Sequence, residues 1–146
     1  MLDSGRVVGG MEYIEGAIKP LKILLAEDCE NNVLLVQLYL KKFPYFIDVA
    51  ENGHAAFELF QRNEYDVVLM DIEMPVTDGY EATTLIRGYE ERNSRAKTPI
   101  VAVTAHALPE NEDRAYEVGC DYFLTKPVRK ADLISTVQKY ANIEPA

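Results

Sequence analysis

Four short runs of apolar residues end at charged or hydroxyl side chains, and this pattern constrains the fold most. The runs cover residues 22–26, 65–70, 99–103 and 121–125, and they stop at Glu27, Asp71, Thr104 and Lys126. They lack the apolar–polar alternation of half-exposed strands, so they are typical of parallel strands covered on both faces. Residues 46–50 do alternate, which predicts a strand at the edge of the sheet.

Apolar residues at helical spacing separate the expected strands. The third expected helix opens at Asp78, with Glu81 three residues later as in a capping box. The fourth begins at residues 108–109 without a good capping side chain and closes at Gly119. Five strand–helix units predict a doubly wound α/β domain with helices on both faces of the sheet. The apolar positions of the five helices are Val33, Val36, Leu40 and Phe43; Ala55, Leu59 and Phe60; Ala82, Leu85, Ile86 and Tyr89; Ala115 and Val118; and Leu133, Val137 and Ala141.

Length and composition predict a single domain with a short leader. The chain has 146 residues, of which 48% are hydrophobic, enough for one buried core without a separate output module. Residues 1–20 are glycine-rich and end at Pro20, so we interpret them as a linker from a larger protein or an extension added by cloning. A short helix within residues 11–18 fits this segment. The domain is expected to cover residues 21–146.

The charge and the absence of targeting signals exclude several classes of protein. A net charge of −9 argues against direct binding of nucleic acid or anionic membranes, which requires a basic surface. No apolar run approaches the roughly 20 residues of a membrane span, and no signal peptide is recognisable. Cys29 and Cys120 are too few for a disulfide framework. These features predict a cytoplasmic protein.

The residues that end the strands form a set suited to phosphoryl chemistry. Parallel strands share their direction, so Glu27, Asp28 and Asp71 are expected at one edge of the sheet, where ligands bind in this architecture. Three crowded carboxylates require a compensating cation, and Mg²⁺ binds through few carboxylates while keeping open positions. Thr104 and Lys126 beside such a metal suit the oxygens of a phosphoryl group.

Residues 21–140 resemble the response-regulator receiver domains of two-component signalling, and most of all the receivers of hybrid sensor histidine kinases. The matching segments are ILLAED, LMDIEMPVTDG, AVTAHA and LTKP, in this order. The resemblance implies a flavodoxin-like fold with strand order 2-1-3-4-5. It also implies a Mg²⁺-dependent phosphoacceptor in a phosphorelay, with Asp71 as the residue that accepts the phosphoryl group and no catalysis beyond its own phosphorylation and dephosphorylation.

The same resemblance assigns roles to the other site residues. Asp28 is implied as a direct Mg²⁺ ligand together with Asp71, Glu27 as a ligand through water, and Glu73 through its backbone carbonyl. Thr104 and Lys126 are implied to bind phosphoryl oxygens, and the bond between Lys126 and Pro127 to be cis. Phe123 occupies the position of the family's switch aromatic, although it could equally be a fixed core residue. Thr104 is implied to move with it.

The implied partners are a histidine kinase or a histidine phosphotransfer domain, and the rest of a hybrid kinase chain. A weak homodimer also fits the family. One departure is Cys29, where the family often has Asn; the histidines are expected at the surface, with His106 close enough to influence an attacking water. The competing interpretations are a phosphatase with an Asp nucleophile, which would need a second Asp where Glu73 stands, and a receiver that only docks partners. Nucleotide and flavin sites lack their phosphate-binding loops.

Overall fold

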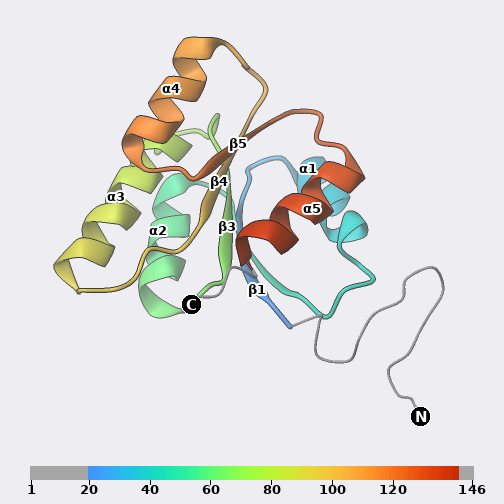
Figure 1. Ribbon diagram of the computed structural model, residues 1–146, viewed down its shortest axis with the longest axis horizontal. Helices are drawn as coiled ribbons and strands as arrows, with labels where there is room; N and C mark the ends of the chain where they lie inside the picture. Colours follow the sequence, from blue (N-terminus) through green and yellow to red (C-terminus); the bar gives the residue numbers. More distant parts are fainter. Residues whose placement is uncertain (1–19, 142–146) are drawn as a thin grey trace.

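The computed structural model describes residues 20–141, which form a five-stranded parallel sheet between two layers of helices (Figure 1). The strand order is β2-β1-β3-β4-β5, so the predicted fold class, strand order and edge position of β2 are confirmed. The expected helix within residues 11–18 lies outside the described residues. In the part of the chain that is described, no helix has the length and apolar character to cross a membrane. The strands are β1 (Lys22–Ala26), β2 (Phe46–Ala50), β3 (Val67–Asp71), β4 (Ile100–Thr104) and β5 (Tyr122–Thr125), and the helices are α1 (Glu30–Tyr39), α2 (Gly53–Arg62), α3 (Gly79–Arg92), α4 (Pro109–Val118) and α5 (Lys130–Ala141).

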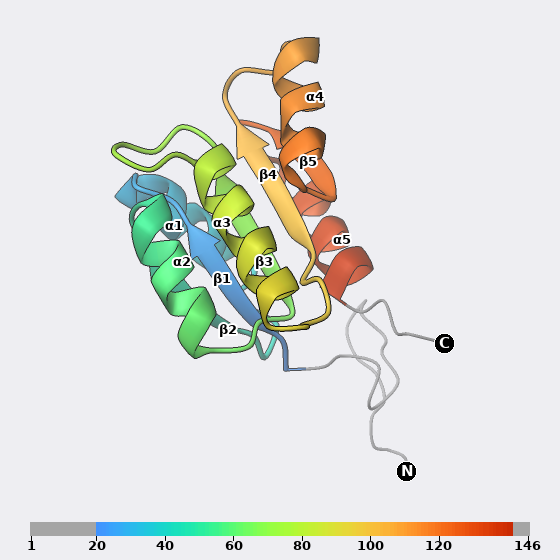
Figure 2. The ribbon, with the colours of Figure 1, turned by 90° about the vertical axis from the view of Figure 1, so that its left-hand side faces the viewer.

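The central strands are apolar on both sides because each side faces a helical layer. Successive strand residues point to opposite faces of a sheet. In β1, Leu24 and Ala26 pack in the cluster under α2, α3 and α4, whereas Ile23 and Leu25 pack in the cluster under α1 and α5. Figures 1 and 2 show these two layers on opposite faces of the sheet. The central strands are therefore apolar throughout because helices cover both faces of the sheet.

Helix α1 is shorter and more exposed than its sequence pattern predicts. It ends at Tyr39, so the prediction that Leu40 and Phe43 lie on its apolar face is wrong. Pro44 explains the early end, because a proline cannot donate to the carbonyl four residues earlier, here that of Leu40, and its ring clashes with that carbonyl in a helix. None of the residues of α1 is fully buried, and the side chains of Leu34 and Leu38 are 56% and 61% exposed.

The start of α3 matches the expected cap in part. Asp78 is the N-cap, and its carboxylate accepts the backbone N–H of Glu81 at 2.9 Å. The hydrogen bonds of residues 20–141 do not include the return bond from the Glu81 side chain, which is exposed. Gly79 follows because a Cβ there would lie 2.5 Å from the backbone oxygen of Asp71. The glycine thus lets α3 start directly against the end of β3.

Helix α4 is weakly anchored. As predicted, its N-cap residue Leu108 makes no side-chain cap, and its C-cap Gly119 is left-handed with φ of 115°. Ala115 is the single buried residue among those of the helix. Helices bury an apolar stripe to gain most of their stability, so α4 has little tertiary packing to hold it in place.

A network centred on Arg87 joins α3 to the loops that lead into β4 and β5. The Arg87 guanidinium donates to the Glu90 carboxylate at 2.7 Å, to the Thr98 carbonyl at 2.9 Å and to the Asp121 carboxylate at 2.9 Å. Its Nε donates to the Gly119 carbonyl at 3.0 Å. The buried Glu90 carboxylate also accepts the N–H of Thr98 at 2.8 Å. The side chains of Arg87 and Glu90, which are largely shielded from solvent, are therefore both hydrogen-bonded within the network.

Candidate functional site

The carboxyl ends of the strands bring the predicted polar residues together. The registers between β1 and β3, β3 and β4, and β4 and β5 align the ends of these strands along one edge of the sheet. The prediction that the carboxylates and the lysine meet there is confirmed. The residues at this edge are Glu27, Asp28, Asp71, Thr104 and Lys126.

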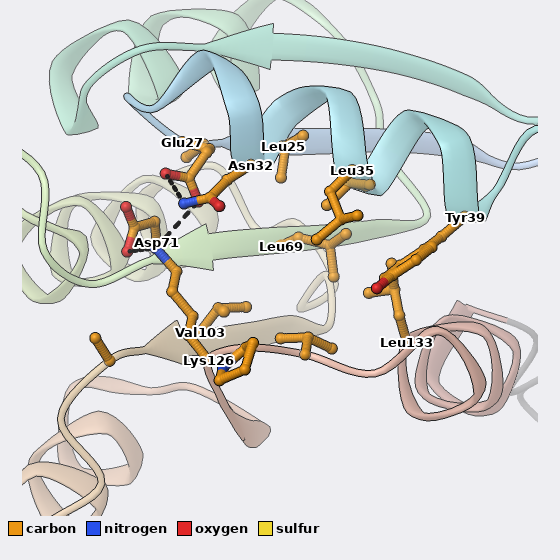
Figure 3. A pocket seen from close by; sticks show the side chains of 15 residues that line it. Leu25, Glu27, Asn32, Leu35, Tyr39, Leu69, Asp71, Val103, Lys126 and Leu133 are labelled. Atoms are coloured by element: carbon orange, nitrogen blue, oxygen red, sulfur yellow. Dashed lines mark hydrogen bonds and ion pairs between the residues drawn. The ribbon is translucent and has the colours of Figure 1, made fainter.

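The ammonium group of Lys126 bridges two buried carboxylates. Its Nζ lies 3.1 Å from Oδ1 of Asp71 and 3.2 Å from Oε1 of Glu27 (Figure 3). Burial alone lowers the pKa of a lysine, but here the two carboxylates outweigh burial and raise the pKa of Lys126. The lysine therefore stays charged and fixed in place. The bond between Lys126 and Pro127 is cis, as the resemblance implied.

Asp71 is a buried carboxylate with one oxygen left without a partner. Its side chain is 2% exposed, and Oδ1 accepts from Lys126 and, at 3.2 Å, from the backbone N–H of Glu73. Oδ2 is buried with no hydrogen-bond partner among the described residues. Burial raises the pKa of Asp71 from 3.8 to about 7, and the nearby charge of Glu27 adds to the rise while Lys126 opposes it. Such a displaced pKa is frequent at functional sites.

The chemistry of these carboxylates fits a divalent cation. One oxygen from each of Glu27, Asp28 and Asp71 lies within 4.8 Å of the others. Asp28 is exposed, whereas Glu27 is buried and already accepts the Cys29 N–H at 3.2 Å and the Asn32 amide at 3.3 Å. The unpartnered Oδ2 of Asp71 would be satisfied by a hard metal ion, which prefers oxygen ligands. The residues present therefore fit the predicted Mg²⁺.

Thr104 is fully buried, and its hydroxyl is bound to a side chain that the sequence did not suggest. It donates to the carboxylate of Glu73, and the N–H of Ala105 donates to the other oxygen of the same carboxylate at 3.0 Å. The reason lies in the two-residue repeat of β4. Thr104 follows Ile100 and Ala102 on the face under α3 and α4, whereas Asp71 follows Val67 and Leu69 on the other face. An acid two residues beyond a strand-ending Asp was the available signal for this contact.

The other singled-out residues surround this centre. Phe123 is half-buried and packs against the cluster under α2, α3 and α4, a position that suits a core residue as well as a switch. His106 is exposed, and its N–H donates to the Thr104 hydroxyl at 3.0 Å. His54 is also exposed and lies 3.4 Å from Glu58 on α2.

An apolar cavity opens beside the site, between α1 and the segment that leads into α5. It has a volume of about 330 Å³ and reaches from Leu133 and Tyr39 to Asp71 and Lys126 (Figure 3). The residues that line it are mostly apolar, and Asp71 and Lys126 lie at its polar end.

Comparison with known proteins identifies relatives along almost the whole described range. The family model of the response regulator receiver domain matches residues 23–138. The sensor protein GacS of Pseudomonas syringae pv. syringae is 36% identical over 122 residues, which cover 84% of this chain and 14% of GacS. Hybrid signal transduction histidine kinase B of Dictyostelium discoideum is 40% identical over 130 residues, which cover 83% of this chain and 7% of that kinase. The chain thus spans a small part of the length of these relatives.

Two solved structures extend the comparison to the site. The receiver domain of a Pseudomonas aeruginosa PAO1 sensor histidine kinase, with magnesium coordinated in its active-site cleft, is 32% identical with a TM-score of 0.76 over 86% of this chain and 100% of that one. The receiver domain of the yeast response regulator Ssk1 was solved with the histidine phosphotransfer protein Ypd1. That structure matches with 27% identity and a TM-score of 0.81 over 86% of this chain and 91% of the matched chain.

Proposed function

Because the chain belongs to the family of response regulator receiver domains, which act in phosphorelay signalling, we propose that Asp71 is its phosphoacceptor. One oxygen of Asp71 attacks the phosphorus of a phosphohistidine, the P–N bond breaks, and the imidazole leaves with its electron pair. The product is an acyl phosphate. The observation that carries the proposal is the buried Asp71 carboxylate at the end of β3, held by Lys126 and with Oδ2 unpartnered.

The neighbouring residues prepare Asp71 for this reaction. Asp28 and Asp71 would supply carboxylate oxygens to the metal, Glu73 its backbone carbonyl, and Glu27 would act through water. Mg²⁺ bound there would neutralise charge between the carboxylates and the incoming phosphoryl group. Lys126 already lies 3.1 Å from Asp71, and it pairs with a phosphoryl oxygen once the acyl phosphate forms.

Phosphorylation adds charge and acceptor oxygens at the sheet edge, and the hydroxyl of Thr104, the last residue of β4, is a donor for them. Thr104 moves toward the phosphoryl group and Phe123 repacks inward behind it. Weakly anchored α4 is the element whose position this repacking shifts. The output surface is therefore the one that includes α4 and β5.

A signalling role is favoured over a phosphatase by the residue at position 73. A phosphatase of this kind would use an acid there to protonate a leaving group. Here both oxygens of the Glu73 carboxylate accept hydrogen bonds from the end of β4. The domain is proposed to catalyse its own phosphorylation and dephosphorylation and no turnover of a separate substrate.

Incubation with acetyl phosphate and Mg²⁺ tests the proposed phosphoacceptor. The intact protein is expected to gain the mass of one phosphoryl group, and omission of Mg²⁺ to suppress the gain. Asp71→Asn should stay unmodified, while the control Asp113→Asn, a change of an exposed acid on α4, should react as the unaltered protein does. A phosphoryl group retained by Asp71→Asn would place the acceptor elsewhere.

The donor is proposed to be a histidine kinase or a histidine phosphotransfer domain. Two of the compared relatives are a sensor protein and a hybrid kinase, and the solved Ssk1 receiver was crystallised with the phosphotransfer protein Ypd1. We propose that this chain is likewise the receiver part of a hybrid kinase. A weak homodimer is compatible with the same role.

The exposed leucines of α1 are the proposed docking surface for that donor. Leu34 borders an open depression that also contains Glu27 and Asp28, so a partner seated on Leu34 and Leu38 would lie next to the phosphoacceptor edge. Burial of such apolar side chains drives protein association. Both side chains are more than half exposed, so this face of α1 is open to a partner.

Replacement of both Leu34 and Leu38 by Ala is expected to slow phosphoryl transfer from phosphorylated Ypd1 by about tenfold, because exposed apolar anchors of this size contribute about 1 kcal/mol or more. Phosphorylation by acetyl phosphate should be unchanged. Leu108→Ala, at the start of α4, provides a control with 56% exposure of the original side chain. Equal transfer by the double variant would move the docking surface away from α1.

A further inference from the structure

The carboxylate of Glu73 connects the ends of β3 and β4. The side chain belongs to an exposed residue, yet the hydroxyl of Thr104 donates to one of its oxygens and the N–H of Ala105 to the other at 3.0 Å. Meanwhile the backbone N–H of Glu73 donates to Oδ1 of Asp71 at 3.2 Å. One residue therefore contacts the phosphoacceptor through its backbone and the end of β4 through its side chain.

The two donors that Glu73 occupies lie at the end of β4, directly after Val103, which pairs with Asp71 in the sheet. A phosphoryl group on Asp71 would have three oxygens to satisfy, of which Lys126 and a metal can take two. The third requires a hydroxyl or an amide, and Thr104 and Ala105 offer both. Carboxylate and phosphoryl oxygens compete for the same donors, because each is an anionic acceptor of charge-assisted hydrogen bonds.

We propose that Glu73 is a tethered competitor of the phosphoryl group, a positioning residue that holds Thr104 and Ala105 in the unphosphorylated arrangement until it is displaced. This inference rests on the proposed function of Asp71. Release of the two donors is then coupled to departure of the Glu73 side chain from the site. The affinity of the site for a phosphoryl group is set in part by this exchange, since only the difference between the two sets of hydrogen bonds counts.

Binding of beryllium fluoride, a stable phosphoryl analogue, in the presence of Mg²⁺ tests the competition. Glu73→Ala leaves the backbone N–H and carbonyl in place and is expected to tighten binding about tenfold, which corresponds to the loss of one charge-assisted hydrogen-bond contact that must otherwise be broken. Fluorine NMR titration measures the affinity. An affinity equal to that of the unaltered protein would overturn the inference.

Two matched variants distinguish the loss of the Glu73 hydrogen bonds from the loss of its negative charge. Glu73→Asp keeps the charge but shortens the side chain by one methylene, so it should bind the analogue as tightly as Glu73→Ala does, or nearly so. Glu81→Gln removes one exposed carboxylate charge from the start of α3 and should leave the affinity unchanged. If Glu73→Asp instead matched the unaltered protein, or Glu81→Gln gained as much as Glu73→Ala, charge alone would explain the effect and the inference would fail.

A second readout examines the contact without any analogue. The amide resonance of Ala105 in the ligand-free protein should shift in Glu73→Ala and Glu73→Asp but not in Glu81→Gln, since a lost hydrogen bond changes the shielding of its donor. An unmoved resonance would contradict the proposed contact. A different result would show that Asp71 is not the phosphoacceptor. In that case Asp71→Asn and the unaltered protein would bind beryllium fluoride equally.

Discussion

Replacement of Asp71 by Asn is expected to raise the free energy of unfolding by about 3 kcal/mol at pH 8 in the absence of Mg²⁺. The pKa of Asp71 rises from 3.8 to about 7 in the folded protein, first because of burial and then because of Glu27. A carboxyl group with a raised pKa stabilises the fold while it is protonated. That contribution is complete below pH 4 and is lost as the pH rises through 7, where the folded protein must ionise a buried group.

Asparagine is neutral at every pH and similar in shape, so it avoids this loss. The full shift, which already includes the opposing effect of Lys126, corresponds to on the order of 4 kcal/mol, and the imperfect match of an amide to the hydrogen bonds of the carboxyl reduces the net gain. Urea denaturation from pH 4 to pH 8 should show the difference between the two proteins growing up to about pH 7 and then levelling. Asp113→Asn, a change of an exposed acid, should show no such growth.

Added Mg²⁺ should narrow the difference at pH 8, because a ligand that binds only the folded state stabilises it. The unaltered protein should gain stability with the metal, and Asp71→Asn much less, since one ligand carboxylate is gone. A variant less stable than the unaltered protein at pH 8 without metal would show that the Lys126 ion pair outweighs burial. That result would contradict a raised pKa of Asp71 in the folded protein.

Replacement of Arg87 by Ala is expected to lower the free energy of unfolding by about 3–5 kcal/mol, because it leaves the buried Glu90 carboxylate without its cation. The side chain of Glu90 is 3% exposed and that of Arg87 is 12% exposed, so water cannot readily take the place of the guanidinium. The carbonyls of Thr98 and Gly119 would lose their donor as well. Urea denaturation measures the loss.

Two further variants show whether the buried charge is the cause. Arg92→Ala, on the exposed side of the same helix, should change stability by less than about 0.5 kcal/mol. The double replacement of Arg87 by Met and Glu90 by Leu should recover much of the loss, since apolar residues of similar volume can replace a buried ion pair. If the double variant were no more stable than Arg87→Ala, the lost backbone contacts of Arg87 would be the larger effect.

The convergence of Glu27, Asp71 and Lys126 could be predicted because it depends only on strand direction. Each ends an apolar run, and parallel strands align their carboxyl ends whatever their order in the sheet. The order itself required the resemblance to a known family. No local pattern distinguishes which central strand pairs with which, since β1, β3 and β4 are apolar on both faces.

One prediction was wrong because a local feature acted against a broader pattern, and one contact of a correctly placed residue was not predicted. The spacing of Leu40 and Phe43 suited a helix, but Pro44 ends that helix earlier, and the residues pack beyond it. Thr104 lies at the edge predicted for it, and its hydroxyl donates to the Glu73 carboxylate. Its partner Glu73 could not be predicted from run ends alone, because the contact depends on the path of the loop between β3 and α3.

The two cysteines differ in reactivity in a way that makes the site accessible to spectroscopy. Burial raises the pKa of the Cys120 thiol to about 11, and its side chain is 6% exposed, so it is a poor nucleophile near neutral pH. Cys29 is exposed, and its backbone N–H donates to the Glu27 carboxylate. A thiol-reactive fluorophore therefore attaches at one position, adjacent to the acidic pair. Its emission is expected to change when a cation binds to the neighbouring carboxylates.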